Sequence, residues 1–275
     1  MCQIHGVSVN DGEAGKPIVL NRRDLVRGLA AGSVVAFSAG CETNPETGRS
    51  QVMLISDAQL SQMSLSAWDD MRRQTPISRD PAANKRLQRV GEKIAIAANR
   101  QDDPWEFVVF NTPEKNAFVL PGGKVGFYKG LMDIAESDDH VATVLGHEIG
   151  HVTGRHAAER YSQSALASVG MAVGQVIIDQ TDVGYKRELA AVLGLGIQFG
   201  YLLPFSRRHE LEADRLGVDY MHRSGYDVRQ AVDFWQRMAG DDRQRPPELL
   251  STHPDPVTRI NDLRAYINAR GYALI

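Results

Sequence analysis

Residues 143–156 read TVLGHEIGHVTGRH, an otherwise apolar run that carries three histidines and one glutamate. Three of these polar residues, His147, Glu148 and His151, form the pattern H-E-x-x-H. On an α-helix, residues i and i+4 lie one above the other, so the imidazoles of His147 and His151 can bind one cation. A helix with surface histidines is the alternative, but the neighbouring side chains are apolar and buried imidazoles need a partner. The stretch therefore predicts a buried helix that supplies two ligands of a metal site.

The chemistry expected of this pattern is hydrolysis with Zn²⁺. The only cysteines are Cys2 and Cys41, so a metal held by the rest of the chain takes nitrogen and oxygen ligands. Zinc in a hydrolytic site uses three protein ligands and one open position, where it lowers the pKa of water from ~15.7 toward ~7. Glu148 lies next to the first ligand, where it can take the proton of that water and return it to the leaving amine.

The third ligand is not in the opening stretch. One subclass of these enzymes extends the pattern to H-E-x-x-H-x-x-G-x-x-H, and Gly154 stands at its glycine position. The final position is Ala157, however, and His156 comes one residue too early. We therefore expect His156 to make a structural hydrogen bond rather than to bind the metal.

A second acidic stretch can supply the missing ligand. Residues 206–217 read SRRHELEADRLG. On a helix, Glu210 and Asp214 share a face, whereas Glu212 points elsewhere. Glu210 can then bind the metal, and Asp214 can accept the second ring N–H of a ligating histidine, which fixes its tautomer. A solvated charged helix is the alternative for this stretch taken alone.

Four segments of the chain, taken in their order along the sequence, match the motifs of a known family. They are NAFVLPGGKVGFYKGLM (116–132), HEIGHVTGRH (147–156), SRRHELEADRLG (206–217) and STHPDPVTRI (251–260). Together they resemble the M48 family of zinc metallopeptidases, which includes CAAX prenyl proteases and bacterial envelope quality-control proteases. The resemblance implies a gluzincin-type metallopeptidase domain with one Zn²⁺ per chain.

The resemblance also implies a role for each matching residue. His147, His151 and Glu210 would be the zinc ligands, and Glu148 would be the general base. Asp214 matches the aspartate that the family places beside the ligands.

Two further residues take their expected roles from the resemblance alone. His253 and Arg259 match a histidine and an arginine that lie near the metal in the family. His253 would either stabilise the tetrahedral intermediate or occupy the open zinc position at rest. The hairpin 116–128 would form a substrate-facing edge, to which an extended peptide adds as a strand.

The whole pattern predicts an α+β fold that is mainly helical, with a small hairpin edge beside the helix of the metal pair. Hydrophobic spacing, caps and turn signals place the elements. Helices are expected over 57–75, 81–99, from Ser137 through the opening stretch, over 207–223, 229–239 and 259–269, and strands over 105–111 and within 116–132. Two interrupted apolar segments, 165–178 and 189–203, are expected to form a buried or membrane-touching helical pair.

Residues 1–40 resemble an export signal. Arg22 and Arg23 form a twin-arginine pair, a short apolar run follows over 29–39, and small residues precede Cys41. The pattern predicts export and lipidation of Cys41, although position 38 is a serine where a lipoprotein box most often has leucine. An amphipathic or buried first helix is the alternative.

The predicted organisation then has two further parts. Residues 41–56 are polar and are expected to be a flexible tether, and residues 57–275 are expected to be the peptidase domain. This organisation places the protein in the bacterial periplasm as a lipoprotein anchored to the inner or the outer membrane.

Composition limits the class of partner. The chain has 275 residues, 43% of them hydrophobic, and a net charge of −3, so one globular domain is expected and no global field attracts nucleic acid. The expected substrates are polypeptides, misfolded or unassembled envelope proteins bound as extended strands. Two alternatives stay open. One is a proteolytically quiet zinc-containing chaperone or assembly factor, in which His253 stays on the metal, and the other is a metal-dependent hydrolase of non-peptide substrates.

Overall fold

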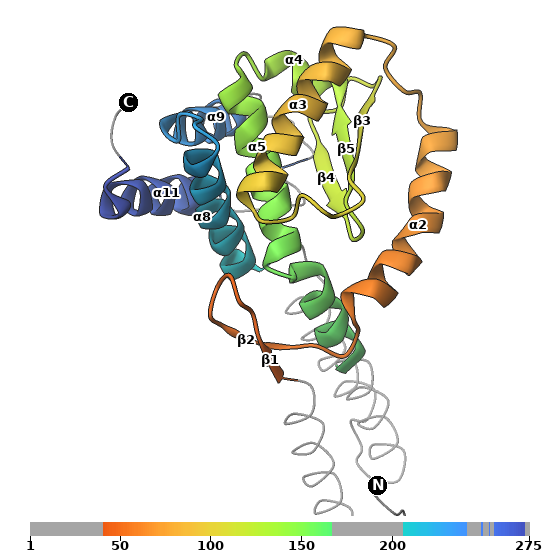
Figure 1. Ribbon diagram of the computed structural model, residues 1–275. Helices are drawn as coiled ribbons and strands as arrows, with labels where there is room; N and C mark the ends of the chain where they lie inside the picture. Colours follow the sequence, from red (N-terminus) through yellow and green to blue (C-terminus); the bar gives the residue numbers. More distant parts are fainter. Residues whose placement is uncertain (1–40, 167–205, 241–248, 250–252, 254–255, 273–275) are drawn as a thin grey trace, which may run out of the picture. The chain divides into compact units, whose positions relative to one another are not determined.

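A three-stranded sheet lies between helices in the computed structural model, which describes residues 41–166, 206–240, 249, 253 and 256–272 (Figure 1). All of these residues belong to one unit, Cys41–Ile275. The predicted export signal and nearly all of the predicted apolar pair lie outside the described residues.

The elements are mostly helices, and their positions follow the sequence closely. They are β1 (Cys41–Thr43), β2 (Ser50–Val52), α2 (Asp57–Gln74), α3 (Pro81–Ala97), β3 (Glu106–Phe110), β4 (Ala117–Leu120), β5 (Lys124–Tyr128), α4 (Lys129–Ile134), α5 (Asp138–Thr153), α8 (Arg207–Arg223), α9 (Arg229–Gly240) and α11 (Pro256–Arg270). The predicted α+β, mainly helical fold is confirmed. Helix α11 begins at Pro256, ahead of the expected Arg259, because the fixed φ of proline suits the first helical turn.

The sheet has the strand order β3-β5-β4. Strand β3 runs parallel to β5, and β4 pairs antiparallel with β5 as the predicted hairpin. Gly122 and Gly123 close this hairpin with φ values of 88° and 74°, which glycine adopts without a steric penalty. Among the described residues, β4 is therefore an edge strand of the sheet.

The two faces of the sheet meet different helices because strand side chains alternate. Val125 and Phe127 join the main core with α3 and α5. On the opposite face, Trp68 of α2 packs against Phe110 and Phe118, with ring centroids 6.0 and 6.3 Å away. The result is a layered arrangement of α2, sheet and a pair of helices.

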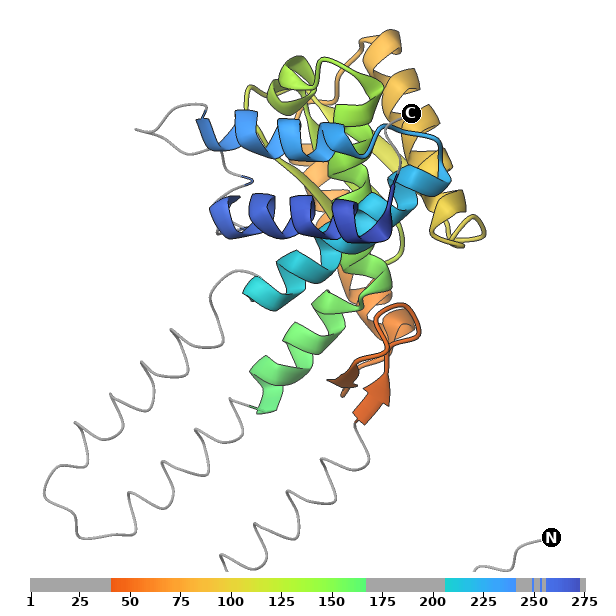
Figure 2. The ribbon, with the colours of Figure 1, turned by 90° about the vertical axis from the view of Figure 1, so that its left-hand side faces the viewer.

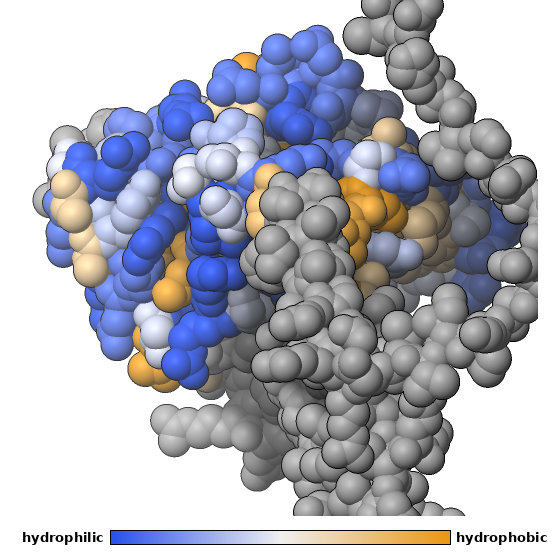
Figure 3. All heavy atoms as spheres, turned by 90° about the horizontal axis from the view of Figure 1, so that it is seen from below, coloured by the Kyte–Doolittle hydropathy of each residue, from blue (hydrophilic) through white to orange (hydrophobic). Residues whose placement is uncertain are grey.

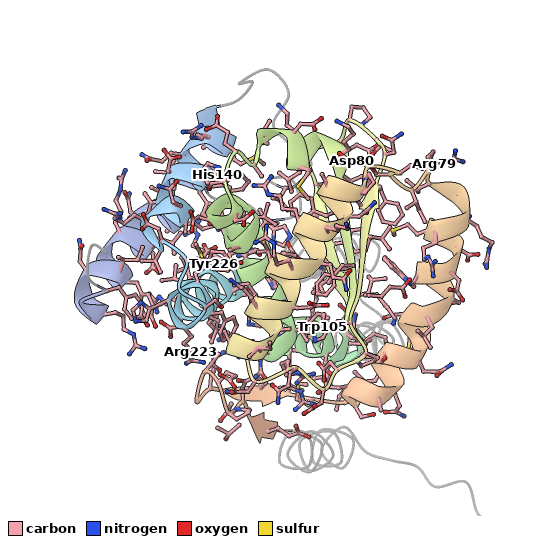
Figure 4. The ribbon with its side chains drawn as sticks, turned by 45° about the horizontal axis from the view of Figure 1, so that its top comes forward. Arg79, Asp80, Trp105, His140, Arg223 and Tyr226 are labelled. Atoms are coloured by element: carbon pink, nitrogen blue, oxygen red, sulfur yellow. The ribbon has the colours of Figure 1, made fainter. Side chains whose placement is uncertain are left out.

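Polar side chains fix where the helices begin. Asp80, labelled in Figure 4 just before α3, accepts a hydrogen bond from the backbone N–H of Ala82. Ser137 caps α5 as expected, and Ser206 caps α8 in the same way, by accepting from the backbone N–H three residues later. These caps set the start of the two helices, α5 and α8, that carry the H-E-x-x-H residues and Glu210.

Helices α5 and α8 are in close contact because small residues face each other. A Cβ placed on Gly146 would lie 2.9 Å from the carbonyl oxygen of Gly217, and one on Gly150 would lie 2.7 Å from that of Ala213. Real Cβ atoms do not approach backbone this closely, so larger residues would push the helices apart. The pairing of Gly146 with Gly217 and of Gly150 with Ala213 also shows that the two helices run antiparallel. Helices α9 and α11 lie side by side next to this pair (Figure 2).

Residues 42–51 are polar, as expected, but residues 41–56 do not form a free tether. Strands β1 and β2 pair into a hairpin that docks on the end of α5. The buried side chain of Asn44 donates to the carbonyl of Thr153 at 2.9 Å, and that of Gln51 donates to the carbonyl of Gly154 at 2.6 Å. Carbonyls at a helix C-terminus have no partner within the helix, so these side chains satisfy them.

One face of the described part of the molecule is mainly polar. Seen from below, hydrophilic side chains predominate and hydrophobic ones form separate patches (Figure 3). Within the described ranges, no helix is long and apolar enough to cross a membrane.

We predict that Gly146→Ala destabilises the protein by about 1–3 kcal/mol, because the new methyl group meets the backbone of α8. Chemical denaturation of the metal-free protein in excess chelator measures this loss. Gly240→Ala, at the end of α9 where no atom of the described residues lies within 4 Å of the new Cβ, is the matched control. Equal stability of the two variants would contradict the close packing of α5 and α8.

Candidate metal centre

Four buried side chains converge where α5, α8 and the residues before α11 meet. His147 and His151 come from α5, Glu210 comes from α8, and His253 precedes α11. One ligand atom of each lies within 4.8 Å of the others. The structure therefore brings together the three residues expected to bind the metal, with His253 as a fourth.

The spacing and chemistry of these atoms fit a metal ion. The Nε2 atoms of His147 and His151 are 3.1 Å apart, and each lies 3.5 Å from an oxygen of Glu210. The Nδ1 atom of His253 is 3.1 Å from both oxygens of Glu210. Tetrahedral zinc with ligands at 2.0–2.1 Å places ligand atoms about 3.3 Å from one another. Imidazole nitrogens and a carboxylate are also the ligands zinc takes in hydrolytic sites.

Burial alone does not mark a ligand. His140 lies on the same helix α5 and is equally buried, but its Nε2 lies 3.1 Å from the side-chain oxygen of Gln230 on α9 (Figure 4). It is well outside the cluster because it lies nearly two helical turns before His147. The i, i+4 spacing distinguishes the two expected ligands, His147 and His151, from such a histidine.

Glu148 lies beside the cluster with one oxygen unpaired. Its side chain is buried, and Oε1 has no hydrogen-bond partner among the described residues. The nearest ring nitrogen is Nε2 of His253, 3.6 Å away. Burial raises the pKa of Glu148, so this carboxylate has an increased affinity for a proton. An unpaired buried carboxylate next to a metal-ligand cluster is suited to accept a proton from water.

Asp214 and Arg259 hold the ring of His147 from the outside. Asp214 Oδ1 lies 2.8 Å from His147 Nδ1. Arg259 donates to both oxygens of Asp214, from Nε and Nη2, at 2.7 Å each. Its Nη1 is also 3.3 Å from Glu210, and its guanidinium stacks 4.2 Å from the ring centre of Trp235. A fully buried arginine is tolerated here because two carboxylates and an aromatic face surround it.

At the ring of His147 the surrounding carboxylates favour a cation, whereas burial holds the pKa of His151 well below its usual value. Burial and Arg259 both act to lower the pKa of His147, but Asp214 and Glu210 outweigh them and raise it to about 9. Carboxylates that stabilise a protonated imidazole also stabilise a metal ion at the same place.

His156 and Glu212 lie outside the four-residue cluster, as expected. His156 Nδ1 is 2.9 Å from Nδ1 of His151, and its Nε2 is 3.1 Å from Glu212. Glu212 also accepts from Arg49, which lies between β1 and β2. The prediction of a hydrogen-bonding rather than a ligating His156 agrees with these contacts.

Reasoning from sequence spacing missed two residues, Trp235 and Arg49. Trp235 had the spacing of an ordinary core aromatic, and only the fold shows that it lies under Arg259. Arg49 was part of a segment expected to be a tether. Both act through contacts between residues far apart in the chain, which local spacing does not reveal.

A cleft of about 320 Å³ leads to the cluster. Residues 116–122, which include strand β4, line one side, and Glu148, His151 and His253 line the part next to the metal cluster. Leu60 of α2 adds apolar surface. An edge strand thus lies along the same cleft as the carboxylate of Glu148 and two histidines of the cluster.

The site combines a histidine–glutamate donor set, a buried carboxylate beside it and a sheet edge along the cleft. These are the features of a metal-dependent peptidase fold. Residues 81–267 match the model of peptidase family M48, and the chain belongs to this family. M48 is a family of metal-dependent peptidases.

Named relatives agree with this assignment. The chain is 31% identical over 253 residues to the β-barrel assembly-enhancing protease of Escherichia coli K12, covering 89% of this chain and 51% of the relative. It is 32% identical over 249 residues to the protein of that name from Yersinia pestis, covering 84% and 50%. It is 33% identical over 183 residues to the mitochondrial metalloendopeptidase OMA1 of Schizosaccharomyces pombe, covering 66% and 52%. The chain spans about half the length of these relatives.

Proposed function

We propose that the chain is a zinc-dependent metalloendopeptidase. The observation that carries the proposal is the spacing of the donor atoms of His147, His151 and Glu210, which suits tetrahedral zinc and lies at a cleft with an edge strand. Zinc is proposed over other metals because the donors are two imidazoles and one carboxylate, the set found in hydrolytic zinc sites. One ion per chain would bind.

The proposed reaction divides the work among named residues. When bound, zinc would polarise the carbonyl of the peptide and lower the pKa of a water. Glu148 would accept the proton of this water and deliver it to the leaving nitrogen. Asp214, held by Arg259, would keep the Nδ1 proton of His147 in place, so that Nε2 faces the metal. His253, 3.6 Å from Glu148, would donate to the oxygen that becomes negative.

The proposed substrates are unfolded or unassembled proteins of the bacterial envelope. A peptide that adds to the free edge of β4 is recognised through its main chain, which suits many sequences as long as they are extended. The names of the β-barrel assembly-enhancing relatives support a role in the envelope.

The proposed location is the periplasm, with the chain anchored to the inner or outer membrane through a lipidated Cys41. The signal-like order of residues 1–40 supports this proposal. Cys41 is free and exposed at the start of β1. From there the β1–β2 hairpin leads directly onto the end of α5, so an anchor at Cys41 would hold the metal centre near the membrane surface.

The alternative is a proteolytically quiet zinc protein that binds unfolded chains. It is supported by the position of His253, whose Nδ1 lies 3.1 Å from Glu210 and from Nε2 of His147. A histidine at this place can act as a fourth ligand and exclude water from the metal.

We predict that Glu148→Gln lowers the rate of casein cleavage by roughly 10²–10⁴-fold, because a glutamine amide cannot accept the proton. Cleavage is followed on a gel or with fluorescent casein at equal metal loading. Glu92→Gln, an exposed change on α3 away from the cleft, is the control. Equal cleavage by Glu148→Gln and the wild type would contradict the peptidase proposal. Binding of casein without cleavage by the wild type, with cleavage gained in His253→Ala, would favour the quiet alternative.

We predict that the protein recovered from bacterial membranes begins at Cys41 and carries acyl chains. Mass spectrometry of the amino-terminal peptide reports the cleavage position and the lipid mass together. A Cys41→Ser variant should appear in the soluble envelope fraction or stay unprocessed. An amino terminus upstream of residue 41, without added lipid mass, would contradict the anchoring proposal.

A further inference from the structure

The chain kinks at the end of α5 and places the ring of His156 against that of His151. Helix α5 ends at Thr153, and Arg155 has a φ of 55°, which is uncommon for a residue other than glycine. A second helical stretch starts at His156. A Cβ on Gly154 would lie only 2.5 Å from Nε2 of His156, so glycine is needed there for the ring to fit. Gly154 thus leaves room for the His156 ring against the end of α5.

His156 is the middle member of a buried chain of contacts. Its side chain is fully buried, and its Nδ1 lies 2.9 Å from Nδ1 of His151. On the other side, its Nε2 lies 3.1 Å from Oε2 of Glu212. Arg49 donates to both oxygens of Glu212, at 2.7 and 3.0 Å. The contacts thus run from Arg49 through Glu212 and His156 to His151.

The carboxylate of Glu212 determines where the protons lie in this series of hydrogen bonds. Glu212 paired with Arg49 is a carboxylate and can only accept, so Nε2 of His156 must donate to it. A neutral His156 then has an unprotonated Nδ1, which accepts the proton on Nδ1 of His151. His151 is left with its lone pair on Nε2, the atom that faces Glu210 and His147. The opposite order would leave Nε2 of His151 protonated and unable to bind a metal.

The two proposed ligand histidines therefore have matching support. His147 has a carboxylate, Asp214, directly on its Nδ1. At His151 the contact of Nδ1 is with His156, which links the ring to Glu212. Each ring is oriented by a carboxylate, one directly and one through an intervening imidazole. Such outer partners fix the tautomer of a ligand and raise its basicity.

We propose that His156 is a positioning residue that holds His151 in the tautomer that presents Nε2 to the metal, with Glu212 and Arg49 setting the direction of the hydrogen bonds. The proposal rests on the proposed role of His151 as a ligand. Its consequence is that the β1–β2 hairpin, which carries Arg49, forms part of the support of the metal centre.

Two substitutions separate this role from simple packing. His156→Leu fills the space but removes both hydrogen bonds. His156→Asn places an amide oxygen near the former Nδ1 position, where it can still accept from His151. We expect His156→Leu to weaken zinc binding by roughly 10–100-fold, and His156→Asn to recover most of that loss.

The measurement is the zinc dissociation constant, by competition with a chromophoric chelator, alongside thermal unfolding of the zinc-free proteins. Recovery of zinc affinity by asparagine but not leucine, at similar zinc-free stability, supports the proposal. Wild-type affinity in both variants, or equal weakening in both, overturns it. If the wild type itself does not bind zinc, the proposed function fails, and this outcome is distinct from the other two.

Nitrogen-15 NMR of the zinc-loaded wild type tests the same proposal without a substitution, so poor folding of a variant does not prevent the test. We expect a proton on Nδ1 of His151 and on Nε2 of His156, with Nδ1 of His156 unprotonated. A proton on Nδ1 of His156 would overturn the proposed direction of these hydrogen bonds.

Discussion

The close contact between α5 and α8 is the constraint on which the metal centre depends. Gly146 and Gly150 lie against Gly217 and Ala213, so the two backbones are in direct contact. At this separation Glu210 lies between the two histidines of α5, and Asp214 reaches the outer nitrogen of His147. Side chains of ordinary size in the contact would move the carboxylates away from the rings. The geometry of the candidate metal centre is thus a consequence of helix packing.

Buried charge is the second requirement that shapes the centre. Glu148, Glu210 and Asp214 are buried together, which is costly for carboxylates unless cations neutralise them. Arg259 neutralises part of this charge through Asp214 and Glu210, and a metal ion would neutralise more. On the far side of His151, Arg49 has the same role for Glu212 and Glu159. The amino-terminal hairpin and the last helix therefore contribute one arginine each.

Sequence spacing was sufficient wherever a residue acts within its own element. The i, i+4 rule placed His147 and His151 on one face and separated Glu212 from Glu210 and Asp214. The glycine turn placed the β4–β5 hairpin, and family resemblance placed His253 and Arg259 near the metal.

Contacts between distant segments could not be predicted in this way. Gly146 and Gly217 are unremarkable in the sequence, and only the packed helices show what they allow. Residues 41–56 were expected to be a tether because they are polar. Their polarity has another cause: Asn44 and Gln51 satisfy carbonyls at the end of α5, and Arg49 binds the carboxylates of Glu159 and Glu212. Composition does not distinguish a polar segment that forms hydrogen bonds with water from one that forms them with the end of a helix.

X-ray absorption at the zinc edge of the zinc-loaded wild type tests the central claim most directly. We predict one zinc per chain in a shell of nitrogen and oxygen atoms at about 2.0–2.1 Å, with the multiple-scattering signal of at least two imidazoles. A sulfur atom at about 2.3 Å would place the metal on a cysteine. That result, or a shell without imidazole, would contradict a centre assembled by α5 and α8.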